Sequence, residues 1–173
     1  LSEAGATVPT SWEELQAAAQ AVTDNTDAYG YGMPLGSEEA QAETAMWLFS
    51  NGGGYGTVDE ITVDTPENLE AVQFMQQLID AGLTQPDAGA AQRTPMLDQF
   101  VQGQFAMAVG LTATVGMIEE RNPDMNYSIV PFPAADGGES STLGVADHLM
   151  AFKNDDDKAE AIGAFLDYFY QGE

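Results

Sequence analysis

The chain contains a single histidine, His148, which directly follows Asp147 and lies a few residues after Ser140. These are the residue types of a serine hydrolase, in which a histidine base activates the serine hydroxyl. The sequence around Ser140 does not resemble a nucleophile elbow, and adjacent side chains of a strand point to opposite faces. The absence of cysteine also excludes a thiol nucleophile. We therefore predict no catalytic residues and a protein that is not an enzyme.

Paired carboxylates are a second catalytic arrangement, because glycoside hydrolysis uses two of them. The chain has 28 acidic residues, so many such pairs can be drawn and none of them is singled out. A hydrolase that acts on saccharides therefore stays as an alternative.

Two short motifs could bind an ion. The run Asp155-Asp156-Asp157 lacks the spacing and the glycine of a calcium-binding EF-hand loop, and it is more typical of a helix start, where carboxylates complement the helix dipole. The run Asn51-Gly52-Gly53-Gly54 lacks the Lys-Ser/Thr pair of a phosphate-binding loop and is more typical of a helix end and a turn. We predict no metal site and no cofactor.

Binding of a neutral sugar needs aromatic faces for stacking and polar groups that hydrogen-bond hydroxyls. Trp47 lies off the helix face that Met46 and Phe49 define, so it either faces a ligand cleft or packs in the core. Thr112 and Thr114 follow the short apolar run 105–109, which is typical of a buried strand. Because α/β sheets present ligands at the carboxyl ends of their strands, both threonines are candidate ligand-binding residues.

The elements that position these residues alternate between helices and short strands, which predicts an α/β fold. Thr10 is expected to cap the first helix, with Glu13 completing a capping box. Apolar spacing predicts the buried stripe Trp12, Leu15, Ala18, Ala19 and Val22 on that helix and the stripe Leu69, Val72, Met75, Leu78 and Ile79 on a third helix. Further helices are expected from Ser37, from Thr94 as N-cap, and over residues 112–121 and 156–170, with strands at 29–34, 105–109, 127–130 and 143–152.

The order Phe100-x-x-Gly103-x-x-Ala106-Met107 resembles a signature of the extracellular solute-binding proteins of ABC importers. The sugar-binding group that includes maltose-binding protein is the most similar. Other segments resemble that family in the same order along the chain: 8–15, Asn51-Gly-Gly53, 64–67 and 130–133.

The resemblance implies a periplasmic-binding-protein-like lobe with a short mixed sheet flanked by helices. In that family two lobes hold the ligand between them, and residues 1–142 would form most of the second lobe. Residues 143–173 would form a crossing strand and a helix that belong to the first lobe, which is then a missing partner. The implied function is capture of a neutral sugar for a membrane permease, outside the cytoplasmic membrane or anchored at the cell surface. A structural cell-surface module without a small-molecule ligand is a further alternative.

The resemblance also implies site residues. Glu38 and Glu39 lie at the start of a helix where the family carries part of its ligand site, although carboxylates there also complement the helix dipole. Asp147 and His148 lie on the run that crosses between the lobes, where their alternative is an ordinary strand surface. The sugar-stacking Trp usual in the family is absent from residues 111–115, which argues against a long oligosaccharide.

The last predicted helix carries an apolar face without a predicted partner in this chain, formed by Ile162, Phe165, Leu166 and Phe169. The chain begins at Leu1 in a segment that resembles the middle of a longer protein, so we expect it to be part of one. Exposed, each of these side chains would lose about 1.5–3 kcal/mol of burial energy. We therefore expect the helix to fold back on the lobe or two chains to form a homodimer through it.

The charge balance is extreme, with 28 acidic residues against 4 basic ones and a net charge of −24. Nucleic acid is therefore excluded as a partner, since phosphate contacts need Lys and Arg. Solubility alone needs a net charge of only about 2–8. The excess favours a halophilic protein with an acidic surface over an ordinary acidic secreted protein.

We predict that the stability of this chain rises with salt, because screening relieves repulsion between carboxylates more in the compact state than in the expanded one. The unfolding midpoint, followed by circular dichroism from about 0.1 M to about 3 M KCl, should rise most steeply below about 1 M, where the Debye length falls to about 3 Å. A flat profile would exclude the high-salt interpretation.

Overall fold

The computed structural model describes residues 1–146, 148–153 and 156–171. The chain divides into two compact units, Leu1–Leu143 and Gly144–Glu173.

The first unit contains five α-helices, two short 3₁₀ helices and two strands in its described residues. In chain order these are η1 (Ser2–Ala4), α1 (Trp12–Asn25), β1 (Tyr29–Gly32), α2 (Ala40–Ser50), α3 (Pro66–Asp80), η2 (Ala88–Ala90), α4 (Arg93–Val101), β2 (Phe105–Ala108) and α5 (Thr112–Arg121). The predicted α/β class is confirmed, and α5 has the predicted bounds.

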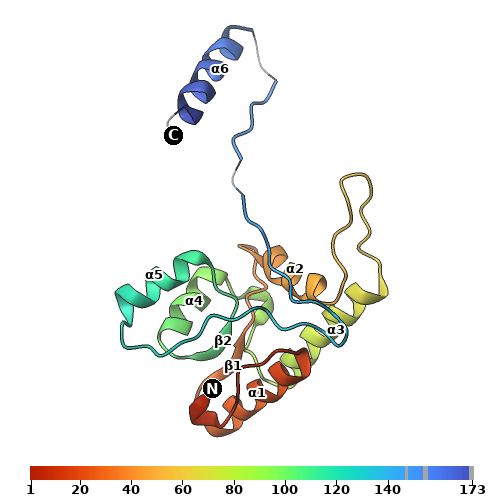
Figure 1. The fold of residues 1–173 in the computed structure, drawn as a ribbon, viewed down its shortest axis with the longest axis vertical. Helices are drawn as coiled ribbons and strands as arrows, with labels where there is room; N and C mark the ends of the chain where they lie inside the picture. The colour runs from red at the N-terminus through yellow and green to blue at the C-terminus, as the bar shows by residue number, and fades with distance from the viewer. Residues whose placement is uncertain (147, 154–155, 172–173) are drawn as a thin grey trace. The chain divides into compact units, whose positions relative to one another are not determined.

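The sheet consists of β1 and β2, which pair in parallel with Tyr29 opposite Phe105 and Gly32 opposite Ala108. Figure 1 shows α4 and α5 together on one side of the strands and α2 and α3 on the other. α1 packs against both strands. Since the strands are parallel, their carboxyl ends reach the same edge of the sheet.

The strand predicted at 127–130 does not form, and no described residue of 143–152 lies in a strand either. Ile129 and Val130 are exposed, so the apolar run that suggested a strand finds neither a core nor a neighbouring edge. Apolar runs of this length do not distinguish a strand from an extended surface segment.

The cap of α1 differs from the prediction by one residue. Ser11, not Thr10, is the N-cap, and its Oγ accepts from the Glu14 amide at 3.2 Å. The Glu14 carboxylate, not that of Glu13, accepts from the Thr10 amide and hydroxyl, both at 2.8 Å. These hydrogen bonds lower the pKa of Glu14. The predicted buried stripe of α1 is confirmed, from Trp12 to Val22.

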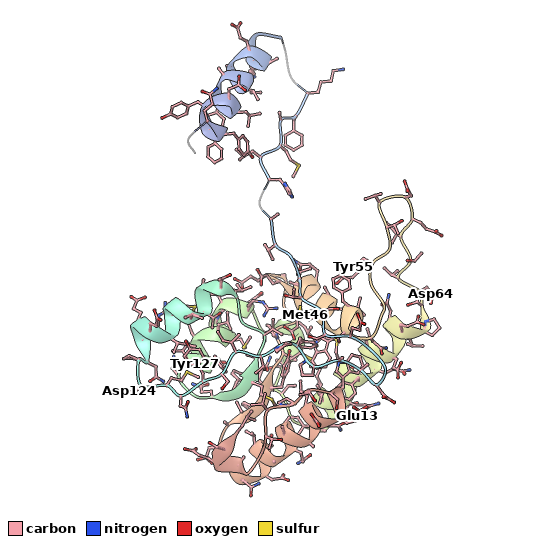
Figure 2. The ribbon with its side chains drawn as sticks, viewed as in Figure 1. Glu13, Met46, Tyr55, Asp64, Asp124 and Tyr127 are labelled. Atoms are coloured by element: carbon pink, nitrogen blue, oxygen red, sulfur yellow. The ribbon has the colours of Figure 1, made fainter. Side chains whose placement is uncertain are left out.

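The predicted stripe of α3 is only half right. Met75 and Leu78 are buried, whereas Leu69 is 60% exposed and Val72 is 50% exposed. The helix turns a different face inward at its start, where buried Asn68 occupies the inner position. The Asn68 amide donates to the carbonyls of Gly54 and Val63, at 2.7 and 3.0 Å, which fixes both ends of the loop that precedes α3. Figure 2 shows that loop rising between Tyr55 and Asp64.

Trp47 is the centre of the aromatic core. It is fully buried, and its ring lies 4.9–5.8 Å, between centroids, from the rings of Trp12, Tyr31, Phe74 and Phe132. These partners come from α1, β1, α3 and the segment after α5, so one side chain connects most of the first unit.

The second unit contains α6 (Asp156–Tyr170), with the bounds that the sequence predicts. Within this unit, α6 and residues 149–152 line a groove of about 360 Å³. Phe165 and Phe169 are both more than half exposed. The apolar face of α6 is therefore largely open in this unit.

Two leucines of α3 give a matched test of the corrected stripe. Leu78→Ala should lower the free energy of unfolding by about 2–5 kcal/mol, because Leu78 is fully buried and its loss leaves a cavity. Leu69→Ala should change it by no more than about 0.5 kcal/mol, because Leu69 is mostly exposed. Urea denaturation measures both variants, and equal losses would contradict the orientation of α3 described above.

Candidate functional site

The carboxyl ends of β1 and β2 form the edge at which an α/β lobe would present a ligand. After β1 the chain enters Met33 and Pro34, which are buried. After β2 it passes from half-buried Val109 to Gly110, Leu111 and Thr112, which are all exposed. The segment 110–112 is therefore the open part of this edge.

Arg93, the first residue of α4, is buried behind the edge and contacts three groups. Its Nη2 donates to Glu43 Oε2 at 3.0 Å, and its Nη1 donates to the Val109 carbonyl at 3.0 Å. Its Nε forms an ion pair of 2.6 Å with Glu39 Oε2, although this contact lacks hydrogen-bond geometry. One guanidinium thus joins the start of α2, the end of β2 and the start of α4.

Glu43 is the anion that balances Arg93 in the interior. Its side chain has no exposed surface, and its Oε1 accepts from the Tyr31 hydroxyl at 2.7 Å and from Trp47 Nε1 at 3.1 Å. Burial raises the pKa of Glu43, while the hydrogen bond from Tyr31 and the charge of Arg93 oppose that rise. Burial and the Glu43 charge likewise raise the pKa of Tyr31 well above its ordinary value.

The predicted site residue Glu38 has a structural task. Its two carboxylate oxygens accept from the Thr94 hydroxyl at 2.6 Å and from the Thr94 amide at 3.0 Å, so the side chain caps α4. These hydrogen bonds lower the pKa of Glu38. Thr94 was expected to be the N-cap of α4, but the helix begins at Arg93 and Glu38 satisfies the Thr94 amide. Glu38 therefore lies near the edge with both oxygens already engaged.

Of the two predicted threonines, one is exposed and the other is used by the fold. Thr112 is the exposed first residue of α5. Thr114 is buried, and its Oγ1 accepts from the Leu111 amide at 2.9 Å, which stabilises the start of α5. Thr112 is thus open to a ligand, whereas the Thr114 hydroxyl supports the turn beneath it.

Of the two alternatives for Trp47, core packing describes its position in this structure. The residue is fully buried, other aromatic rings pack against its ring, and its Nε1 donates to Glu43. The helical spacing did not decide between cleft and core, because α2 is buried on several sides. Four consecutive residues are buried: Ala45, Met46, Trp47 and Leu48.

His148 is exposed in the second unit, and Asp147 lies outside the described residues. Of the predicted site residues, the structure brings Glu38, Thr112 and Thr114 to one edge of the first unit. Sequence reasoning missed Arg93 and Glu43 entirely. A usable signal was present, because Glu39 and Glu43 are spaced one helical turn apart in a chain with only 4 basic residues.

Neither a metal site nor a membrane span is found in the part of the chain that the structure describes. No group of three or more His, Cys, Asp or Glu side chains there could hold a metal ion. No helix there has both the length and the apolar character needed to cross a membrane.

Removing one charge of the buried ion pair should lower the free energy of unfolding more than removing both charges does. Arg93→Met should lower the free energy of unfolding by about 3–5 kcal/mol at neutral pH, because it leaves Glu43 buried without a counter-charge. The loss should shrink as the pH falls through the raised pKa of Glu43, since protonation removes that charge. Arg93→Met combined with Glu43→Leu should recover much of the stability. Chemical denaturation at several pH values measures all three, and a double variant no more stable than Arg93→Met would contradict this account.

Comparison with known proteins is consistent with this geometry. The profile of the bacterial extracellular solute-binding protein family matches residues 1–171. A binding protein of Brucella abortus is 31% identical over 171 residues, an alignment that covers 94% of this chain and 40% of the relative. The chain therefore spans about 40% of the length of the curated relatives it matches.

Solved structures of similar fold come from the same class of protein. An ABC transporter solute-binding protein of Thermotoga lettingae, bound with α-D-tagatose, has a TM-score of 0.70 and 28% identity, covering 82% of this chain and 37% of that one. The cyclic α-maltosyl-1,6-maltose binding protein of Arthrobacter globiformis has a TM-score of 0.65 and 27% identity, covering 97% and 43%. The fold is thus that of periplasmic binding proteins, and the chain belongs to the bacterial extracellular solute-binding proteins.

Proposed function

We propose that this chain is part of a solute-binding protein that captures a neutral sugar for an ABC importer. The observation that carries the proposal is the open segment 110–112 at the carboxyl ends of two parallel strands, in a chain that is 28% identical to a tagatose-bound relative. Exposed backbone groups, the Thr112 hydroxyl and the partly exposed carboxylate of Glu39 are groups that hydrogen-bond sugar hydroxyls.

The charge distribution favours a neutral ligand. Both arginines of the sequence are engaged, Arg93 by Glu39 and Glu43 and Arg121 by Asp98. A free guanidinium is the usual bidentate partner of a phosphorylated or dicarboxylate ligand, and neither arginine of this chain supplies one.

The division of labour between lobes follows from the proposal. The first unit would be the second lobe of the parent protein, and residues 144–173 would pack in the first lobe. The open apolar face of α6, with Phe165 and Phe169 more than half exposed, would then be covered by that lobe. A membrane permease would be the further partner, and the parent protein would be extracellular or anchored at the cell surface.

The isolated chain offers a second way to cover α6. At high salt, where repulsion between acidic surfaces is screened, we propose that two copies pair through this helix. Light scattering should then report a dimer that the Phe165→Glu, Phe169→Glu double variant abolishes. A monomeric wild-type chain at high salt would exclude the homodimer.

The two-lobed protein should bind one neutral sugar tightly and release it unchanged, because the described edge exposes hydrogen-bonding groups and the described residues there assemble no nucleophile with a base. Calorimetry against neutral mono- and disaccharides, followed by chromatography of the recovered sugar, measures binding and turnover together. A sugar phosphate serves as the charged control and should bind weakly. Hydrolysed product would indicate the saccharide hydrolase, and no binding by any sugar would favour the structural surface module.

A further inference from the structure

Arg93 is an unusual residue to find buried in this chain. The sequence has 4 basic residues against 28 acidic ones, and Arg93 retains only 2% of its surface. A buried ion pair is often no more stabilising than apolar side chains of similar volume. Stability alone therefore does not explain why a guanidinium lies here, and its three contacts suggest another role.

The contact with Val109 fixes where the chain leaves the sheet. Val109 follows the last residue of β2, and its carbonyl accepts from Arg93 Nη1 at 3.0 Å. Two residues later the Leu111 amide donates to Thr114 Oγ1 at 2.9 Å. The turn that carries exposed Gly110 is thus held at both sides, by Arg93 before it and by Thr114 after it.

The contact with Glu39 fixes the other side of the same edge. Glu39 is the N-cap residue of α2, and its side chain is 35% exposed. One guanidinium contacts both groups, since Glu39 Oε2 lies 2.6 Å from its Nε and the Val109 carbonyl oxygen lies 3.0 Å from its Nη1. Buried Arg93 therefore sets the distance between the start of α2 and the segment 110–112.

We propose that Arg93 is a positioning residue for ligand binding, which acts through Val109 and Glu39 and does not itself touch the ligand. The inference rests on the proposed function, since it assigns a ligand to the edge 110–112. Arginine suits this task better than lysine, because its planar fork directs several donors at once while an ammonium is a compact point charge. Arg93→Lys should therefore retain the charge beside Glu43 but lose the bridge between the two sides.

The test separates affinity from stability in the two-lobed protein. Four variants are compared with the wild type by calorimetry and thermal unfolding: Arg93→Lys, Arg93→Met, Arg93→Met with Glu43→Leu, and Leu78→Ala. The probes are glucose, galactose, maltose and cellobiose. Leu78→Ala is the matched control, because it destabilises the same unit from a buried core position on α3.

For the sugar that the wild type binds, each Arg93 variant should bind about 10- to 100-fold more weakly, as expected when binding groups shift by about 1 Å. The double variant should regain stability but not affinity, and Leu78→Ala should lose stability while its affinity stays within about twofold of the wild type. An affinity that recovers together with stability in the double variant, or that falls equally in Leu78→Ala, would overturn the positioning role. A wild-type protein that binds none of these sugars and none of the wider neutral panel would instead overturn the proposed function, and this inference with it.

Discussion

The buried contact between Arg93 and Glu43 is the constraint on which the rest of the first unit depends. Two charges withdrawn from water are tolerated only when their geometry is good and their remaining polar atoms are satisfied. Tyr31 and Trp47 supply that satisfaction for Glu43, and the Val109 carbonyl takes one donor of Arg93. This polar network therefore connects the aromatic core to the edge of the sheet. A substitution in the core that shifts Glu43 should also shift Arg93 and the edge.

This arrangement separates two kinds of carboxylate in a very acidic chain. Glu38 and Glu43 have structural roles: Glu38 caps α4, and Glu43 is the counter-charge of Arg93. Most of the other acidic side chains that the structure describes lie on the surface. Glu39 is intermediate, since it contacts the buried guanidinium and still reaches solvent.

The sequence by itself determined the α/β class, the family and the parts of the fold that depend on local patterns. The bounds of α5 and α6 match the ranges predicted from the sequence. The stripe of α1 also follows, because one side of that helix faces the sheet and the other faces water, so a single 3.6-residue period describes it.

Only the tertiary structure decided which side chains are free to bind. Glu43 contacts Arg93 across 50 residues of sequence, and Glu38 contacts Thr94 across 56 residues. The spacing of Glu39 and Glu43 marks two carboxylates on one helix face, but it does not tell which basic residue they meet. The sequence left Trp47 open between cleft and core because a helix surrounded by neighbours has no single apolar face. Leu69 was assigned wrongly because a helix start next to a loop can turn a polar residue such as Asn68 inward. A polar or aromatic side chain can bind a ligand only if other parts of the chain have not already engaged or buried it. Those contacts form between residues far apart in sequence, so they are set when the chain folds.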